Sequence, residues 1–205
     1  MLRKISLSVA ILAALTLSGC DDTRGSKPSE AGWPAAAAEA ADPVAALNQL
    51  KGFNVGKGAS AVSMPTAYVL FDPQCPHCAH LWNEAKPLES KVLIKWIPVG
   101  WLNGMSATQG AMLLEAADPV ALMSANEAVM LRTGRPSTDT AAVKDETLAH
   151  VKANTAMLAT LKVTSVPTII YRDPATKNLE IVSGARPTAE LEKMFGIADG
   201  AAGAK

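Results

Sequence analysis

The sequence predicts an α/β domain whose strands are separated by one long helical segment. Three runs rich in β-branched and aromatic residues are typical of buried strands: 66–71, 92–99 and 166–171. The stretch 103–162 has no such run and carries helix signals instead. Of the 205 residues, 49% are hydrophobic and 19% are charged, which suffices for the core of one ordinary domain and excludes a disordered tail or a fibre.

The domain is expected to occupy residues 42–197, and its first element is a helix. Asp42 supplies an N-cap and Pro43 takes the first helical position, just before an apolar face. A second helix follows the first strand and a pair of cysteines, and it extends over 79–88 as far as Pro87 permits.

The segment 103–162 is predicted to be a helical insertion between two strands of the sheet. Asp118 and Pro119 mark a helix start, and residues 134–137 mark a break. A later helix carries apolar residues at spacings of three, seven and three positions, namely Leu148, Val151, Leu158 and Leu161.

A hairpin and a short helix are predicted to end the domain. The turn sequence 173–178 follows the strand at 166–171 and precedes another apolar run at 179–182, so these two strands are expected to pair. The last helix is expected over 188–195.

Residues 1–19 have the pattern of a lipoprotein signal peptide. Arg3 and Lys4 precede an apolar run over 5–17, which is shorter than the ~20 residues that span a bilayer. The letters Leu-Ser-Gly-Cys that end at Cys20 resemble the lipobox of bacterial lipoproteins. We therefore expect cleavage before Cys20 and lipid on Cys20; the alternative is a plain cleaved signal with an incidental cysteine.

Composition changes on either side of the domain. Residues 20–41 are rich in alanine and proline and are expected to be a flexible tether, and residues 198–205 a disordered tail. Asp21 and Asp22 resemble the signal that keeps enteric lipoproteins at the inner membrane. The expected location is the periplasm, an oxidising compartment, with the protein anchored to the inner membrane by the lipid on Cys20.

Charge and cysteine counts exclude several classes of protein. Basic and acidic side chains number 19 each, so the formal charge is +0 and no basic excess is available for nucleic acid. Only three cysteines occur, at positions 20, 75 and 78, which excludes a scaffold held by several disulfides.

The motif Cys75-Pro76-His77-Cys78 carries the predicted chemistry. It follows a strand and opens a helix, so Cys75 is expected at a helix N-terminus, where backbone amides and the helix dipole favour the thiolate. Cys78 can reach the same sulfur, and His77 adds a donor and, when protonated, a positive charge. A stable reduced form makes the corresponding disulfide oxidising.

Three other uses of these cysteines are weaker interpretations. A zinc site could include His77 or His80, but no second cysteine pair exists and His150 is remote in sequence. Covalent haem attachment needs a histidine where Ala79 stands. A structural bridge across so short a loop would stabilise the fold little. We therefore expect no metal and no cofactor.

The runs 71–78 and 163–168, with the helical insertion between them, resemble the periplasmic Dsb proteins of the thioredoxin superfamily, DsbG and DsbC above all. The resemblance covers about 47–196. It implies a thioredoxin-like fold with the helical insertion between the active-site βα unit and the cis-proline strand. It further implies that Cys75 is the nucleophile, Cys78 is the resolving cysteine, Pro76 and His77 tune the redox potential, and an extended substrate pairs with the chain at Val166, cis-Pro167 and Thr168.

Two features depart from DsbG and DsbC. The tether and first helix cannot supply the N-terminal dimerisation domain of those proteins, so a monomer is expected. A histidine at position 77 and a valine at position 166 match the oxidant DsbA, whereas DsbG and DsbC usually have tyrosine and threonine there.

The expected function is a periplasmic thiol:disulfide oxidoreductase that reduces or isomerises disulfides in exported proteins. The alternatives are a DsbA-like dithiol oxidase and a non-enzymatic thioredoxin-like chaperone or metallochaperone. Expected partners are exported cysteine-containing proteins, a membrane redox partner (DsbD-like for a reductase, DsbB-like for an oxidase) and the membrane itself through the lipid on Cys20.

Overall fold

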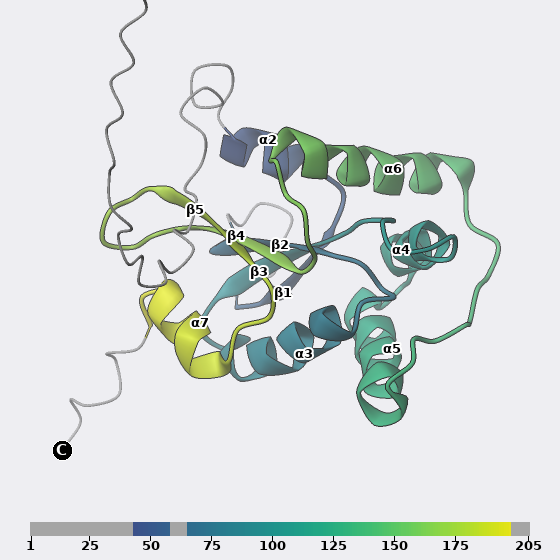
Figure 1. Cartoon of the computed structure of the whole chain (residues 1–205), viewed down its shortest axis with the longest axis horizontal. Coiled ribbons are helices and arrows are strands. Elements are labelled where there is room, and N and C mark those ends of the chain that lie inside the picture. Colours follow the sequence, from purple (N-terminus) through teal and green to yellow (C-terminus); the bar gives the residue numbers. More distant parts are fainter. Residues whose placement is uncertain (1–42, 58–64, 198–205) are drawn as a thin grey trace, which may run out of the picture.

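A five-stranded mixed sheet forms the centre of the structure, a computed structural model that describes residues 43–57 and 65–197 (Figure 1). The strand order is β1-β3-β2-β4-β5; β2 and β3 are parallel and all other pairs are antiparallel. The strands are β1 (Phe53–Gly56), β2 (Ala67–Phe71), β3 (Leu93–Pro98), β4 (Thr168–Arg172) and β5 (Leu179–Ser183).

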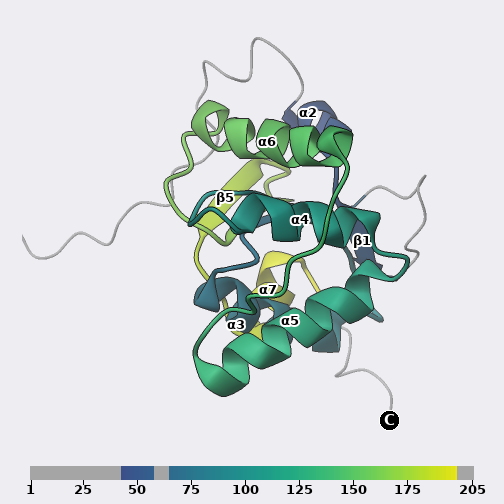
Figure 2. The same ribbon diagram turned by 90° about the vertical axis from the view of Figure 1, so that its right-hand side faces the viewer.

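Helices cover both faces of this sheet and one end of it (Figures 1 and 2). On one face lie α2 (Pro43–Gln49) and α6 (Asp145–Thr160), and on the other lie α3 (Pro76–Ala85) and α7 (Thr188–Met194). The end at which α3 begins is covered by α4 (Ser106–Glu115) and α5 (Pro119–Thr133), and a short 3-10 turn, η1 (Lys86–Leu88), follows α3.

The predicted signal peptide at 1–19, the lipidation at Cys20, the tether at 20–41, the N-cap at Asp42 and the tail at 198–205 all lie outside the described residues. Within the described part of the chain, no helix is long and apolar enough to cross a membrane.

The predicted strands are present, and the hairpin joins the last two of them. β2 is buried at every position, and β4 pairs with β5 from Thr168 opposite Ser183 to Arg172 opposite Leu179. The third predicted strand begins two residues late, because Val166 and Pro167 are joined by a cis peptide bond and precede β4. β1, which pairs with β3, was not predicted.

The segment 103–162 folds as the predicted helical insertion. Asp118 accepts a hydrogen bond from the backbone N–H of Ala121 (2.9 Å) and caps α5, as its position before a proline indicates. Gly134 ends α5 in the left-handed conformation (φ 67°), with its N–H donating to Met130 O (2.8 Å).

Large aromatic side chains fill the centre of the core. Trp96 of β3 packs edge-on against Trp82 of α3 (ring centroids 4.8 Å apart) and against Phe71 of β2 (5.7 Å). Phe53 of β1 joins them, 6.2 Å from Phe71. Burial of these rings holds α3 against the sheet, and α3 is the helix that the two cysteines open.

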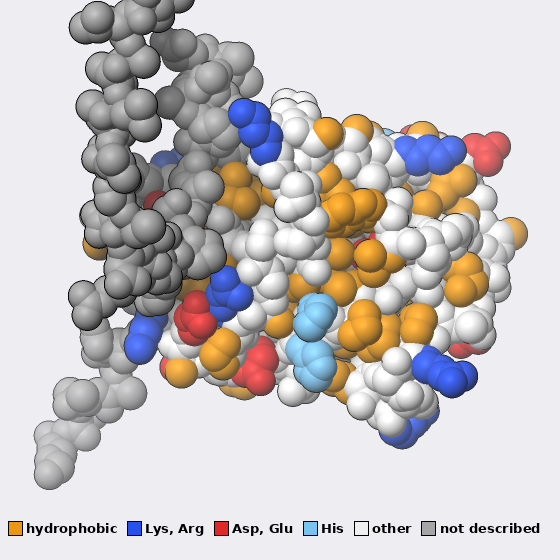
Figure 3. Space-filling view, viewed as in Figure 1, with side chains coloured by type: hydrophobic (Ala, Val, Ile, Leu, Met, Phe, Trp, Pro, Cys, Tyr) orange, Lys and Arg blue, Asp and Glu red, His pale blue; other side chains and the backbone are white. Residues whose placement is uncertain are grey.

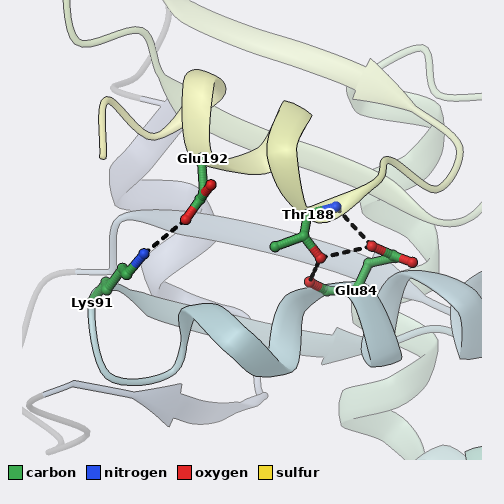
Figure 4. A network of polar contacts seen from close by, with 4 residues as sticks. All are labelled: Glu84, Lys91, Thr188 and Glu192. Atoms are coloured by element: carbon green, nitrogen blue, oxygen red, sulfur yellow. Dashed lines mark hydrogen bonds and ion pairs between the residues drawn. The ribbon is translucent and has the colours of Figure 1, made fainter. Parts of the chain in front are cut away.

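The other end of α3 is fastened to α7 by polar contacts (Figure 4). Glu84 accepts hydrogen bonds from the backbone N–H (2.7 Å) and the hydroxyl (2.7 Å) of Thr188, the first residue of α7. A salt bridge between Lys91 and Glu192 (2.7 Å) lies one turn further along α7. Both ends of α3 are therefore tied to other elements.

Candidate active site

The loop after β2 places Cys75 at the start of α3. Asp72 O accepts a hydrogen bond from Cys75 N–H (3.0 Å), which closes a tight turn after Phe71. Cys75 is the N-cap residue, and its carbonyl accepts from the N–H groups of Cys78 (3.0 Å) and Ala79 (3.2 Å). Pro76 occupies the first helical position, where its missing N–H is not needed.

The two cysteines lie together but differ in burial and acidity. Cys75 is 4% exposed and Cys78 is fully buried, and both are free thiols. The hydrogen bond from the Cys78 thiol, together with the backbone N–H groups of Cys78 and His77, lowers the pKa of Cys75 to about 7 against burial and the charge of Asp72. Burial raises the pKa of Cys78 well above the usual thiol range, and its hydrogen bond to Cys75 and the negative charges nearby add to this. At neutral pH Cys75 is thus the more readily ionised of the two thiols, and Cys78 keeps its proton.

The carbonyl of the residue before the cis-proline lies beside Cys75. The Cys75 thiol donates a hydrogen bond to Val166 O (3.5 Å), and Val166 precedes cis-Pro167. Thr168 has a buried side chain whose hydroxyl donates to Ser165 O (2.8 Å), and its backbone lies in β4 between β2 and β5. These three predicted substrate contacts are all buried, and the structure places the Val166 carbonyl beside Cys75 with Pro167 and Thr168 next in the chain.

The side chains between the cysteines point outward. Pro76 and His77 are exposed. The contribution of His77 to the acidity of Cys75 comes through its backbone N–H. Histidine side chains over α3 lie beside hydrophobic side chains on this face of the molecule (Figure 3).

Asp72 joins the cysteine loop to the loop after β3. Its buried carboxylate accepts three backbone hydrogen bonds at 2.8 Å each, from Gln74, Trp101 and Leu102. The side chains of Trp101 (41% exposed) and Leu102 (49% exposed) are thereby held at the surface near the site. These three contacts give Asp72 the role of a capping residue that ties the two loops together.

A group of buried amides joins the same loop to the helical insertion. The Gln74 side chain donates to Gln109 of α4 and to Ser137 O (2.9 Å), and accepts from Asn103 (3.0 Å). Asn126 of α5 donates to Pro73 O (3.0 Å). The segment between α5 and α6, which crosses α4 in Figure 2, is held by the Gln109 amide and is thereby joined to the cysteine loop through Gln74.

Glu127 is a candidate functional residue that the sequence analysis missed. It is 1% exposed, and neither carboxyl oxygen has a hydrogen-bond partner within the described residues. Burial, followed by the negative charge of Cys75, raises the pKa of Glu127 to about 8, against a lowering effect of the neighbouring Asn126 side chain, which does not reach full hydrogen-bond geometry. A signal was present in the sequence: Glu127 stands on the buried face of a helix with Met123 and Met130, at positions where apolar residues are expected.

The described residues hold no group of three or more His, Cys, Asp and Glu side chains arranged to bind a metal ion. The chemistry that the site can carry lies in its two sulfurs.

No protein-family model matches the chain. Over 132 residues the chain is 28% identical to the thiol:disulfide interchange protein DsbG of Pseudomonas aeruginosa. The matched residues make up 63% of this chain and 50% of that protein. The chain thus spans about half the length of this curated relative.

Solved structures share the fold. A periplasmic thioredoxin-like protein from Salmonella enterica serovar Typhimurium has a TM-score of 0.57 at 15% identity, covering 77% of this chain and 97% of that one. A disulfide interchange protein from Neisseria gonorrhoeae has a TM-score of 0.51 at 19% identity, covering 71% and 94%. The predicted thioredoxin-like fold is confirmed, and the chain is similar to DsbG-like disulfide interchange proteins.

Proposed function

We propose that this protein is a thiol:disulfide oxidoreductase acting on exported proteins, with Cys75 as nucleophile and Cys78 as resolving cysteine. The observation that carries the proposal is the position of Cys75 at the N-terminus of α3: its pKa is about 7, Cys78 hydrogen-bonds to it, and its thiol lies 3.5 Å from Val166 O beside the cis peptide bond. A thiolate at neutral pH next to a second thiol is what disulfide exchange requires.

In the reducing direction, the Cys75 thiolate attacks one sulfur of a substrate disulfide and releases the other as a thiolate. Cys78 then loses its proton and attacks the mixed disulfide at Cys75, which leaves a Cys75–Cys78 disulfide and a reduced substrate. In the oxidising direction the same steps run backwards, beginning with a substrate thiolate that attacks Cys75. Val166 and Pro167 offer backbone beside Cys75 for an extended substrate to pair with.

The likeness to DsbG favours reduction or isomerisation as the physiological direction. A dithiol oxidase is the second candidate, and a specific observation favours it: interactions that lower the pKa of Cys75 stabilise the reduced form, so the disulfide becomes a stronger oxidant. The two residues that resemble DsbA also lie at the cysteines: His77 is in the motif itself, and Val166 O accepts a hydrogen bond from Cys75. A non-enzymatic chaperone or metallochaperone is the remaining alternative.

Location and partners follow from this proposal. We propose a periplasmic protein tethered by lipid on Cys20, and a membrane redox partner that restores the active state of the two cysteines. That partner would be DsbD-like for a reductase or isomerase and DsbB-like for an oxidase.

Two cysteine variants test the mechanism with a peptide disulfide as substrate. Cys75→Ala should abolish exchange, because Cys78 is buried and protonated. Cys78→Ala should still attack but accumulate a mixed disulfide, visible as a mass shift that a reductant reverses. Undiminished exchange by Cys75→Ala would contradict the assignment. Stoichiometric bound metal with no exchange would favour the metallochaperone.

The direction of electron flow is tested in the host cell by acid quenching and alkylation of free thiols. Mostly reduced Cys75 and Cys78 at steady state support a reductase or isomerase, because a partner must then be supplying electrons. Mostly oxidised cysteines support the oxidase.

A further inference from the structure

Neither of the two cysteines can remove the proton from Cys78. Cys78 is fully buried, and burial holds its pKa well above the usual thiol range, so few molecules carry a Cys78 thiolate at neutral pH. Yet Cys78 must become a thiolate in order to attack the mixed disulfide at Cys75. The resolving step therefore needs a base inside the protein.

Glu127 is the buried carboxyl group that can act as this base. Three residues of α5 are fully or nearly fully buried and share one face, at spacings of four and three positions: Met123, Glu127 and Met130. α5 packs across α3, whose own buried face begins with Cys78. The register between them is fixed by Asn126, which donates to Pro73 O (3.0 Å) in the cysteine loop.

The electrostatics connect this carboxyl to both sulfurs. The negative charge of Glu127 contributes to the raised pKa of Cys78, and the charge of Cys75 contributes to the raised pKa of Glu127. When a carboxylic acid has a pKa of about 8, its carboxylate is a stronger base than an ordinary carboxylate. Its pKa is also closer to that of a thiol, which favours proton transfer between the two groups. A buried carboxyl with no hydrogen-bond partner costs stability, so a use for it is expected.

Other ionisable groups around α5 do not compete for this role. Cys75 is the nucleophile, and the Asp72 carboxylate is occupied by three backbone N–H donors. His77 and His80 of α3 are exposed, β1 has no ionisable side chain, and the one on α4, Glu115, is exposed.

We propose that Glu127 is the proton acceptor for Cys78 in the resolving step and the proton donor to it in the reverse step. In the forward direction, the Glu127 carboxylate takes the Cys78 proton, the Cys78 sulfur bonds to Cys75, and the bond from Cys75 to the substrate breaks, releasing a substrate thiolate. In reverse, a substrate thiolate attacks Cys75, the Cys75–Cys78 bond breaks, and Cys78 takes its proton from the Glu127 carboxylic acid. This inference rests on the proposed function and deepens it.

The test separates the two chemical steps with a chromogenic thionitrobenzoate disulfide, mixed with an excess of the reduced full-length protein. The first coloured thiolate is released when Cys75 attacks, and the second when Cys78 resolves the mixed disulfide. Glu127→Gln should leave the first phase near the wild-type rate and slow the second about 100-fold near pH 7, within the usual range for general-base catalysis. The deficit should shrink once the pH rises above the pKa of Glu127, because Cys78 then goes on ionising without help while the carboxylate is already fully formed.

The sign of the effect distinguishes a proton acceptor from a mere negative charge. If Glu127 acted only through its charge, its removal would lower the pKa of Cys78 and speed the second phase. If it only filled space, Glu127→Met, which matches the methionines beside it, would resolve at the wild-type rate. The proposal requires Glu127→Met to be as slow as Glu127→Gln.

The control is Glu146→Gln, which removes an exposed carboxylate from α6 and should change neither phase. Circular dichroism checks that each variant is folded. A second phase that is unchanged, faster, or slower by the same factor at every pH would overturn the role of Glu127. Loss of the first phase from the wild-type protein would instead overturn the proposed function and this inference with it.

Discussion

The sheet and the helical insertion hold the cysteine loop from opposite sides and with different chemistry. β2 and β4 are buried almost throughout, and they fix Cys75 against Val166 through backbone pairing and apolar packing. The segment 103–162 reaches the same loop through polar side chains: the buried Gln109 and the half-buried Asn126 hydrogen-bond to it, and the buried Glu127 interacts electrostatically with both cysteines. The sheet therefore sets where the sulfurs lie, and we propose that the insertion takes part in their proton chemistry.

The largest expected effect lies in the insertion. The folded-state pKa of Glu127 is about 8 against an ordinary 4.5, so folding binds a proton between these values and the free energy of unfolding falls as the pH rises through that window. Glu127→Gln should leave stability unchanged near pH ~4 and raise it by up to ~4 kcal/mol near pH ~9. Urea unfolding of both proteins across this range measures the difference; a constant offset would contradict a raised pKa.

In the sheet, a cavity should cost stability without changing acidity. Ile169 of β4 is fully buried opposite Val69 of β2, so Ile169→Ala should lower the free energy of unfolding by ~3 kcal/mol. Ile181→Ala, at a half-buried position of β5, is the matched control and should cost less. The pKa of Cys75, followed by thiolate absorbance, should stay near 7 in both variants. A marked shift would show that packing within the sheet also controls the acidity of Cys75.

The amide contacts should have an intermediate effect. Gln109→Leu removes the buried oxygen that accepts from the Gln74 amide and the donor to Ser137 O and Asp139 O, and it should cost ~2 kcal/mol. Replacing both glutamines by leucine should cost less than the sum of the two single changes, because the hydrogen bond between them is already lost in each single variant. Additive losses in this double-mutant cycle would show that the two side chains do not interact in solution.

The smallest effect is expected at the far end of α3. Thr188→Val removes the hydroxyl that bonds to Glu84 and should cost ~1 kcal/mol, with no change in either step of disulfide exchange. Thr188→Ser keeps the hydroxyl and serves as the control. A slower exchange in Thr188→Val would indicate that this end of α3 also positions the cysteines.

The sheet and the cysteine motif could be predicted from the sequence because their signals are local. Runs of β-branched residues predict β2, β3 and β4, and the cysteine motif predicts a helix that opens at Cys75, although the predicted range of 79–88 is three residues later than α3 at both ends. β1 was missed because it has four residues, of which Asn54 and Gly56 are poor strand formers; its pairing with β3 comes from distant residues.

The polar surroundings of the cysteines could not be predicted in the same way. Gln74 and Gln109 are separated by 35 positions, and nothing near either residue indicates that it is buried. Glu127 was the exception, since an acid on an apolar helix face is unusual and its spacing from Met123 and Met130 could have been noticed. Which helix that face would meet depends on how the insertion folds back over the site.

The hydrogen bond from Cys75 to Val166 O joins residues 91 positions apart, and this separation has a consequence for the order of assembly. The features that make Cys75 acidic, a helix start and a nearby thiol, are encoded within the motif itself. The surface that would receive a substrate forms only when a very long loop closes, which is slow and entropically costly. A chain synthesised from its N-terminus would thus acquire reactive sulfurs before it forms the surface that recognises a substrate.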